Sequence, residues 1–324
     1  MSSILKRCTL KKLLNLALLA VETKFRVSRL RSHPVYLRIN PCSICNLRCP
    51  SCVTGTAGQV GTTRLGNARM SFASFKKCLD PLKEYLFEIV LYDEGEPLLN
   101  CEVELMVEYA HKNNINTCIS TNLSFKLTEE RIDRLVSSGL DRLIVAVDGL
   151  DQEVYEKHRK GGNLALVMSN LKKFIEARDR LKSRTEIDFQ FIIFEHNRHQ
   201  VEGAKALAHE LKVDRLTIFP SNPHYDGYFF TGQAEERRLL GCYSLFVVAD
   251  IDVDGSLYQC DLAEDNEAKP IGSMLTQDFA SLWNHRSMQA ARAGFRKGSQ
   301  QPMSGLCRRC PTLYGCNGAL AVLR

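Results

Sequence analysis

The sequence alternates six short apolar runs with segments of helical length, and this alternation is the feature that most limits its fold. The runs are VYLRIN from Val35, LFEIVLY from Leu86, NTCIST from Asn116, RLIVAV from Arg142, IDFQFIIF from Ile187 and RLTIFP from Arg215. The helix-length segments between them are 102–113, 128–138, 163–181 and 199–211. Repeated strand–helix units predict a parallel sheet with right-handed crossovers. We therefore expect an α/β fold built on a partial barrel of six β/α units, open rather than closed.

The strand–helix rhythm ends near Pro220, where SNPHYDGYFFTGQ has the Asn, Gly, Pro and Tyr content of a linker or lid. In the following run, LFVVADIDVDGSLYQC, Asp254 and Gly255 predict the turn of a β-hairpin. The predicted parts are an N-terminal basic helical segment (1–34), a barrel (35–234) and a small cysteine-rich hairpin and helix domain (235–324).

Residues 1–38 are strongly basic, with nine Lys or Arg against the single acid Glu22; this segment is +8 and the rest is −2. Apolar residues recur in it at helical spacing, namely Leu10, Leu13, Leu14, Ala17, Leu18 and Val21. The pattern predicts a basic amphipathic helix. Packing on its own domain is the simplest expectation, and contact with an anionic membrane or a partner is the alternative. The apolar run 13–21 is too short to span a bilayer.

Cysteine usage indicates a reducing compartment. Thirteen cysteines in 324 residues are an odd number spread over a mid-sized chain, unlike the dense framework of a small secreted domain. With 44% apolar and 25% charged residues, the chain can build a sizeable core. We expect a cytoplasmic protein, membrane-peripheral if the basic helix meets a membrane, with thiolates committed to metal and no nucleic-acid partner.

Functional groups of parallel strand–helix folds gather at the carboxyl ends of the strands, and CSICNLRCPSC follows the first strand. Within it, Cys45, Cys49 and Cys52 have the spacing C-x3-C-x2-C. This spacing suits three thiolates on three corners of a [4Fe–4S] cubane, with the fourth iron left open. A disulfide pair and a zinc knuckle are the alternatives. Cys42 is expected not to ligate.

The segment CNLRCPSC resembles the CxxxCxxC signature of the radical SAM superfamily, and the resemblance extends over nearly the whole chain. It implies that the amino and carboxylate groups of S-adenosylmethionine (SAM) chelate the open iron. It also implies that one electron from the cluster cleaves SAM to a 5′-deoxyadenosyl radical, which abstracts a substrate hydrogen. An external electron donor such as flavodoxin or ferredoxin is implied as well.

Other matches to the family follow the later strands. The tripeptide Gly95, Glu96 and Pro97 resembles the GGEP motif, whose backbone receives the methionine amino group, although Glu94 stands where glycine is frequent. The resemblance implies that the SAM site also includes Ser120, Thr121, Asn122, Asp148 and Arg159. As alternatives, the Ser-Thr-Asn triplet caps a strand end and Arg159 is a solvated charge at a helix end.

A second cysteine set lies near the carboxyl terminus and consists of Cys242, Cys260, Cys307, Cys310 and Cys316. Its spacing resembles the SPASM/twitch extension of radical SAM enzymes, which binds auxiliary [4Fe–4S] clusters. A full SPASM pattern has a cysteine where Leu320 stands, so the single-cluster twitch-like form is the better match. The ligands implied are Cys242, Cys260, Cys307 and Cys310, with Cys316 in reserve. A zinc ribbon is the structural alternative.

Asp261 directly follows Cys260. In anaerobic sulfatase maturases, which share this extension, an aspartate at the matching place removes a substrate proton. The resemblance therefore implies a two-electron oxidation: hydrogen abstraction, proton removal by a general base such as Asp261, and transfer of an electron to the auxiliary cluster. The alternative for Asp261 is a solvated aspartate at a hairpin end.

The expected substrate is a small molecule or a carbohydrate, because the residues before Val35 are too few for a separate leader-binding domain. A peptide maturase that forms crosslinks or oxidised residues is the alternative. A third interpretation is a non-catalytic zinc or iron–sulfur scaffold. The open-corner spacing and the Gly-Glu-Pro segment argue against it, since a scaffold needs neither.

Overall fold

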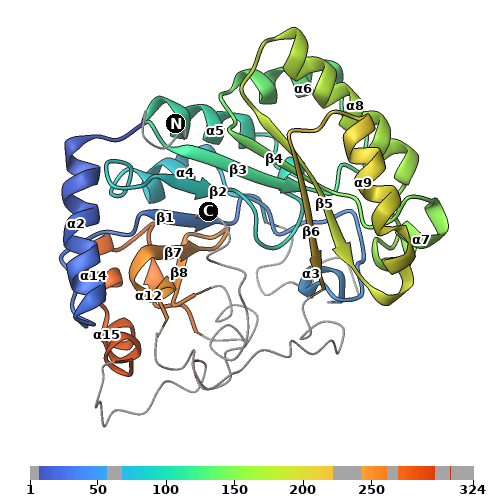
Figure 1. Cartoon of the computed structure of the whole chain (residues 1–324). Coiled ribbons are helices and arrows are strands. Elements are labelled where there is room, and N and C mark those ends of the chain that lie inside the picture. The colour runs from blue at the N-terminus through green and yellow to red at the C-terminus, as the bar shows by residue number, and fades with distance from the viewer. Residues whose placement is uncertain (1–6, 57–67, 222–241, 261–268, 296–306, 308–324) are drawn as a thin grey trace.

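The computed structural model describes residues 7–56, 68–221, 242–260, 269–295 and 307 (Figure 1). The strands of this part form one sheet in the order β6-β5-β4-β3-β2-β1-β7-β8-β9. They are β1 (Tyr36–Ile39), β2 (Glu88–Val90), β3 (Asn116–Thr121), β4 (Arg142–Ala146), β5 (Glu186–Ile193), β6 (Arg215–Pro220), β7 (Val248–Ile251), β8 (Ser256–Tyr258) and β9 (Gly272–Ser273). From β1 to β6 every neighbouring pair is parallel, so the six predicted strands and their open parallel arrangement are confirmed.

Helices connect the strands and cover one face of the sheet (Figure 1). They are α2 (Leu10–Lys24), α3 (Val53–Thr56), α4 (Phe72–Leu79), α5 (Val103–Lys112), α6 (Glu129–Ser137), α7 (Gln152–His158), α8 (Leu164–Arg180), α9 (Val201–Glu210), α12 (Ser244–Val247), α14 (Phe279–Trp283) and α15 (Arg286–Ala293). Short 3-10 turns lie at Pro97–Leu99 and Glu195–Gln200. Side chains that accept backbone N–H groups begin several helices, for example Thr128 before α6, Asp151 before α7 and Asn163 before α8.

The two faces of the sheet differ in chemistry because side chains alternate along each strand. Leu37 and Ile39 of β1 and Ile89 of β2 are fully buried in the main core, on the side of the helices. The intervening residues, such as Arg38 and Glu88, therefore point to the opposite face. We call this opposite face the inner face of the sheet.

The C-terminal part is joined to the barrel sheet, which the sequence pattern did not predict. Strand β7 pairs in parallel with β1, with Leu37 opposite Ala249 and Ile39 opposite Ile251. The expected hairpin follows, since β8 returns antiparallel to β7 and Gly255 takes φ +80° in the turn. The division expected near residue 235 therefore separates segments of chain that share one continuous sheet.

Helix α2 does pack on its own domain, but through its polar face. The buried residues of α2 are Lys12, Asn15, Leu19, Glu22 and Thr23. Its apolar stripe faces outward, as Leu10 and Leu14 are 73% and 62% exposed. Among the described helices, none combines the length and the apolar content that crossing a membrane requires.

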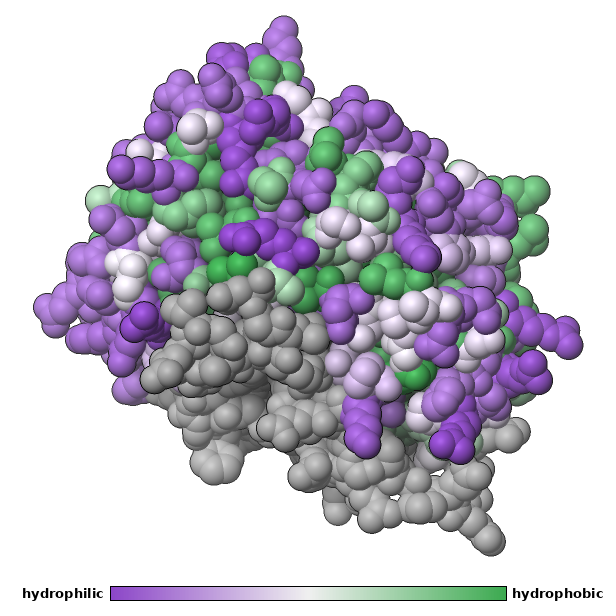
Figure 2. Space-filling view, turned by 180° about the vertical axis from the view of Figure 1, so that it is seen from behind, coloured by the Kyte–Doolittle hydropathy of each residue, from purple (hydrophilic) through white to green (hydrophobic). Residues whose placement is uncertain are grey.

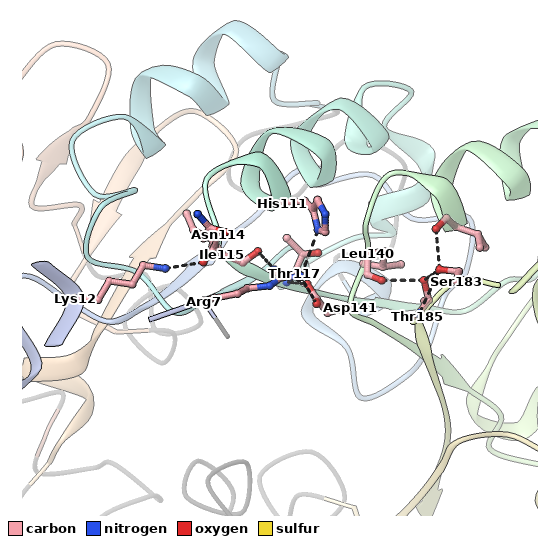
Figure 3. Close-up of polar contacts among 11 residues, drawn as sticks. Arg7, Lys12, His111, Asn114, Ile115, Thr117, Leu140, Asp141, Ser183 and Thr185 are labelled. Atoms are coloured by element: carbon pink, nitrogen blue, oxygen red, sulfur yellow. Dashed lines mark hydrogen bonds and ion pairs between the residues drawn. The ribbon is translucent and has the colours of Figure 1, made fainter. Parts of the chain in front are cut away.

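Specific hydrogen bonds hold the start of the chain against the amino ends of the strands (Figure 3). Arg7 pairs with Asp141 at 2.7 Å and donates to the carbonyl of Ile115 at 2.6 Å. Lys12 donates to the carbonyl of Asn114 at 2.6 Å. These contacts lie at the edge of the sheet opposite to the cysteine loop, which follows the carboxyl end of β1.

The buried Lys12 makes folding stability depend on alkaline pH. Burial, assisted by the charge of Arg7, lowers the pKa of Lys12 to about 8 from 10.5. The unfolded chain therefore binds more protons than the folded chain between these values, and stability rises with pH across that window. We expect wild type to gain up to about 3 kcal/mol relative to Lys12→Met between pH 8 and pH 10.5, from the shift of the Lys12 pKa. Chemical denaturation across this range measures the gain.

The control for this prediction is Lys24→Met, because Lys24 lies exposed on the last turn of the same helix. A constant difference in stability between wild type and Lys12→Met from pH 8 to pH 10.5 would contradict the lowered pKa of Lys12.

Candidate functional site

The three cysteines of the predicted cluster lie on one loop beyond the carboxyl end of β1. Cys49 is buried, and Cys45 and Cys52 are partly buried. A turn closes the carboxyl half of the loop, with the amide of Cys52 donating to the carbonyl of Cys49 at 3.2 Å. Cys42, which was expected not to ligate, is fully buried, and its thiol is 3.6 Å from the carbonyl oxygen of Ile44.

The electrostatics of the loop suit a group that supplies positive charge. Burial, assisted by the charges of Glu96, Cys52 and Cys49, raises the pKa of Cys45 to about 12, although a hydrogen bond from the Leu47 amide opposes the rise. Burial also raises the pKa of Cys49, opposed by the charge of Arg159. Thiolates packed together in this way need bound cations to become stable, as the irons of a cluster are. The donor set therefore fits a [4Fe–4S] cluster.

Within the described ranges, no three His, Cys, Asp or Glu side chains converge as ligands of a single metal ion do. A cubane cluster does not require such convergence, because each thiolate binds a different iron.

The loop after β2 passes very close to the cysteine loop. The amide of Glu96 donates to the carbonyl of Ile44 at 2.7 Å, and the amide of Gly95 donates to the hydroxyl of Thr54 at 3.2 Å. Gly95 has φ +75°, and a Cβ atom there would lie 2.2 Å from the carbonyl oxygen of Cys42. Only glycine meets both conditions, so the backbone of this segment is held directly beside the predicted cluster.

Gly95→Ala is expected to disturb this contact, and Gly161→Ala is its matched control. Gly161 has a similar φ of +79°, but a Cβ atom there would have no described atom within 4 Å. The control therefore carries only backbone strain, about 1 kcal/mol. Gly95→Ala adds the overlap with Cys42, and we expect a loss of at least about 2 kcal/mol in unfolding free energy. Equilibrium dialysis should also show SAM affinity reduced by about tenfold or more, equivalent to about 1.4 kcal/mol.

Equal SAM affinity of the two alanine variants would contradict the predicted contact of the Gly95 backbone with SAM. Chemical denaturation of both variants separates a local effect on binding from a general loss of stability.

Glu96 holds the ends of β2 and β3 together. Its buried carboxylate accepts the hydroxyl of Thr121 at 2.7 Å and the amides of Asn122 and Leu98 at 2.8 and 3.1 Å. Burial raises the pKa of Glu96 to about 7, although these donors oppose the rise. The side chain is thus fully occupied within the protein. Pro97, the next residue, begins the 3-10 turn Pro97–Leu99.

The end of β3 contacts the cysteine loop through Asn122. The Asn122 amide donates to Asn46 at 3.0 Å and lies 3.9 Å from the sulfur of Cys45. Asn46 also donates to the carbonyl of Ser124 at 2.9 Å. Ser120 lies two residues before Asn122 on β3 and is partly buried. The Ser-Thr-Asn triplet is therefore part of the same constellation as the cysteines.

Asp148 and Arg159 form a buried ion pair beside Cys49. One Asp148 carboxylate oxygen accepts Nε and Nη2 of Arg159, both at 2.6 Å, and the other accepts the amide of Ile192 at 2.8 Å. Burial tends to lower the pKa of Arg159, but the charges of Asp148 and Cys49 outweigh it and the pKa is raised. The alternative of a solvated helix-end charge is wrong for Arg159, since its side chain is only 15% exposed.

Two residues of this region were not assigned a role from the sequence. Asn197 is fully buried; its amide donates to the carbonyls of Asp148 and Ile192 at 2.9 and 2.8 Å, which ties the ends of β4 and β5 together. His158 lies 3.3 Å from the hydroxyl of Ser51 and stacks on Phe194 with ring centroids 4.1 Å apart. The position of Asn197 just after a predicted strand could have indicated a role at the site. The sequence around His158, which lies within the helix α7, gave no such indication.

The C-terminal cysteines are described only in part. Cys260 follows β8, and the Gln259 amide donates to the sulfur of the buried Cys307 at 3.4 Å, so Cys307 lies at the end of the hairpin. Cys242 lies just before α12 and is partly buried. The remaining predictions, for Asp261, Cys310 and Cys316, lie outside the described residues.

Sequence comparison identifies two domains in this order. Residues 39–208 match the Radical SAM superfamily, and residues 242–311 match the iron-sulfur cluster-binding domain SPASM. The first match alone covers a little more than half of the 324 residues. The second match indicates iron–sulfur chemistry rather than zinc for the C-terminal cysteines.

Curated relatives differ in how much of the chain they match. A probable GTP 3',8-cyclase of Methanococcus maripaludis is 30% identical over 132 residues, which is 41% of this chain and 42% of the cyclase. The chain thus spans less than half the length of the cyclases that it matches. The mycofactocin maturase MftC of Mycolicibacterium smegmatis is 21% identical over 310 residues, covering 85% of this chain and 74% of MftC.

Solved structures share the fold. SuiB of Streptococcus suis bound to the precursor peptide SuiA superimposes with a TM-score of 0.66 at 16% identity, covering 92% of this chain and 74% of SuiB. BtrN in complex with AdoMet and 2-DOIA gives a TM-score of 0.51 at 17% identity, covering 82% of this chain and 89% of BtrN. At these identities the likeness establishes the architecture of barrel and C-terminal extension.

Proposed function

This chain belongs to the radical SAM superfamily, and we propose on that premise that it carries out a two-electron oxidation of a polar small molecule or carbohydrate. When bound, the first cluster with SAM supplies a radical that removes a hydrogen atom, and the auxiliary cluster supplies an electron acceptor. The substrate gives up one hydrogen atom, one proton and one electron, so that an alcohol becomes a carbonyl group. The observation that supports a polar substrate is the set of charged side chains on the inner face of the sheet.

Paired charges line that inner face. Arg38 lies 3.0 Å from Asp250, and Arg215 lies 3.5 Å from Asp188. The Arg142 Nε is buried without a hydrogen-bond acceptor among the described residues; the nearest Glu186 oxygen is 3.7 Å away. The side chains of the three arginines keep between 24% and 46% of their surface exposed. Hydrogen-bonding groups of this density favour a substrate rich in hydroxyl, amino or carboxylate groups.

The residues at the carboxyl ends of the strands have separate proposed roles. Cys45, Cys49 and Cys52 hold three irons of the first cluster. The backbone at Gly95 receives the amino group of SAM, and Glu96 positions that backbone through its bonds to Thr121 and Asn122. These bonds are made within the protein itself, so they preorganise the Gly95 backbone for SAM.

Further residues proposed for the SAM site follow β3 and β4 in the chain. Asn122 and the Asp148–Arg159 pair border the cysteine loop, within reach of Cys45 and Cys49 respectively. Arg159 is the proposed partner for the SAM carboxylate, and Asp148 orients its guanidinium. Ser120 and Pro97 complete the proposed lining.

The C-terminal residues are proposed to accept the proton and the electron that the substrate gives up. Cys242, Cys260, Cys307 and Cys310 are the proposed ligands of the auxiliary cluster, with Cys316 in reserve. Asp261 is the proposed general base, because it follows Cys260 directly in the sequence. An external one-electron reductant would prime the first cluster for SAM cleavage, and the electron that the auxiliary cluster accepts would return to the first cluster or to that reductant.

The test is a mass-spectrometric assay of the reduced, reconstituted protein with SAM and two substrate panels, one of cyclitols and sugars and one of short peptides. We expect a cyclitol or sugar to stimulate 5′-deoxyadenosine formation and to lose two hydrogens, giving a carbonyl that hydroxylamine traps. A substrate deuterated at that carbon should transfer the deuterium to 5′-deoxyadenosine. An unchanged product mass would indicate epimerisation and would overturn the proposed oxidation.

A peptide maturase is the second candidate, and the match to MftC over 85% of the chain favours it. The same assay separates the two candidates. A peptide that stimulates 5′-deoxyadenosine formation and loses two hydrogens without forming a trappable carbonyl would indicate a crosslink and would replace the first proposal.

A further inference from the structure

The outward face of α2 is a continuous apolar stripe. Its exposed side chains, which we call the α2 stripe, are Leu10, Leu13, Leu14, Ala17, Leu18, Val21 and, just beyond the helix, Phe25. Helical spacing places them along one side of the helix, opposite to the buried residues Lys12, Asn15 and Glu22. Figure 1 places α2 at one edge of the molecule, and Figure 2 shows hydrophobic residues standing out at that edge. Exposed apolar surface of this kind marks an interaction site.

Specific bonds on the polar side prevent the helix from turning its stripe inward. Asn15 exchanges two hydrogen bonds with the backbone of His33, at 3.0 and 2.8 Å. The Glu22 carboxylate accepts the amides of Arg31 and Ser32, at 2.8 and 3.0 Å, and the Ser32 hydroxyl at 2.6 Å. Rotation of α2 would break all of these bonds. The exposure of the stripe is therefore built into the fold.

Basic side chains flank the α2 stripe. Lys24 on the helix and Arg29 and Arg31 beyond it are exposed, and so is Lys11, which pairs with Glu84. All four belong to the segment 1–38, which carries +8. A cavity of about 1120 Å³ lies at the carboxyl end of α2, next to α14 and α15. Its polar lining includes the acid Glu22 and the basic residues Arg29, Arg31 and Arg286. The apolar stripe thus adjoins a region of strong positive charge that could hold phosphate groups.

We propose that α2 lies in the plane of an anionic phospholipid surface, with its stripe among the acyl chains and the flanking basic side chains at the level of the phosphates. Apolar residues on one side and Lys or Arg beside them are what such interfacial helices require. A second copy of this chain fits less well, because two strongly basic segments would be brought together. The helix, of 15 residues, is about 22 Å long and lies on the bilayer rather than crossing it.

Vesicle sedimentation of the full-length reconstituted protein tests this proposal. The probes are vesicles of phosphatidylcholine alone and vesicles that also contain phosphatidylglycerol. The variant is Leu14→Asp with Val21→Asp, which changes the stripe and leaves the packed face untouched. The matched control is Leu105→Asp with Leu181→Asp, because these leucines are 44% and 39% exposed elsewhere on the surface. Melting temperatures verify that both double variants are folded.

We expect wild type and control to bind the phosphatidylglycerol vesicles, more weakly as salt is raised. The stripe variant should bind about tenfold or more weakly, because charged side chains replace buried apolar ones. Lys24→Glu with Arg29→Glu should also weaken binding. Absence of wild-type binding, equal binding to both kinds of vesicle, or equal binding of the stripe variant would overturn the proposal. So would a wild-type dimer that the stripe variant dissociates.

Discussion

Cys49→Ala is expected to abolish reductive cleavage of SAM while the C-terminal cluster stays in place. The substitution removes one of three thiolates that share the loop after β1, and the two that remain cannot hold a cubane with a single open corner. Cys49 is also the cysteine beside Arg159, so its loss changes the surroundings of the proposed SAM carboxylate partner. The measurement is 5′-deoxyadenosine formed by the dithionite-reduced protein, which should fall to the level of the reaction without protein.

Cys42→Ala is the matched control, since Cys42 lies on the same loop and is buried, with its thiol facing the carbonyl of Ile44. This variant should retain SAM cleavage, with a stability loss of about 1 kcal/mol from a small buried group. If Cys49→Ala still produced 5′-deoxyadenosine, or if Cys42→Ala lost that activity with its fold intact, the ligand assignment would be wrong.

Asp148→Ala is expected to cost about 3–5 kcal/mol of unfolding free energy, because it leaves the buried Arg159 guanidinium without its partner. It also leaves the amide of Ile192 without its acceptor. Because Arg159 would lose its orientation beside Cys49, the affinity for SAM should fall as well. Denaturant titration gives the first effect and equilibrium dialysis the second. Asp148→Asn keeps an acceptor for Ile192 and serves if the alanine variant does not fold.

The control is Glu202→Ala, which breaks the pair with Lys205 on the surface of α9. Both side chains are more than half exposed, so the expected loss is at most about 1 kcal/mol. A similarly small loss for Asp148→Ala, with SAM affinity unchanged, would contradict the role given to the buried pair.

The fold of the barrel was largely predictable because its signals are local. Each of the six apolar runs is a strand, and the predicted helical segments 128–138 and 163–181 match α6 and α8 closely. Short strands joined by helices have few parallel arrangements open to them, so the alternation predicted the open partial barrel. The hairpin turn was likewise predictable from the dipeptide Asp254-Gly255, and Gly255 has the positive φ of such a turn.

Features that depend on distant parts of the chain were not predictable. The pairing of β7 with β1 joins residues more than two hundred positions apart, and nothing in either strand specifies the other. The periodicity of α2 identified an amphipathic helix but did not say which face is buried. Individual hydrogen bonds, such as the one from Ser32 to Glu22, determine which face is buried and outweigh the hydrophobic pattern.

The residues of the candidate site that belong to a recognisable motif were predicted from the sequence. The structure brings the Cys45–Cys49–Cys52 loop, Gly95, Asn122 and the Asp148–Arg159 pair together at the carboxyl ends of the strands. Spacing alone did not indicate that Glu96 would be turned inward as a support, or that Asn197 would join two strand ends. These side chains act through backbone groups, which leave little trace in a sequence pattern.

The most direct test of the account is the iron and sulfide content of the anaerobically reconstituted protein, with and without replacement of Cys45, Cys49 and Cys52 by alanine. Two cubane clusters, one in each part of the chain, predict about eight irons per chain, falling to about four in the triple variant. A value of about four falling to none would contradict the account, because the C-terminal cysteines would then hold no iron and the proposed oxidation would lack its electron acceptor.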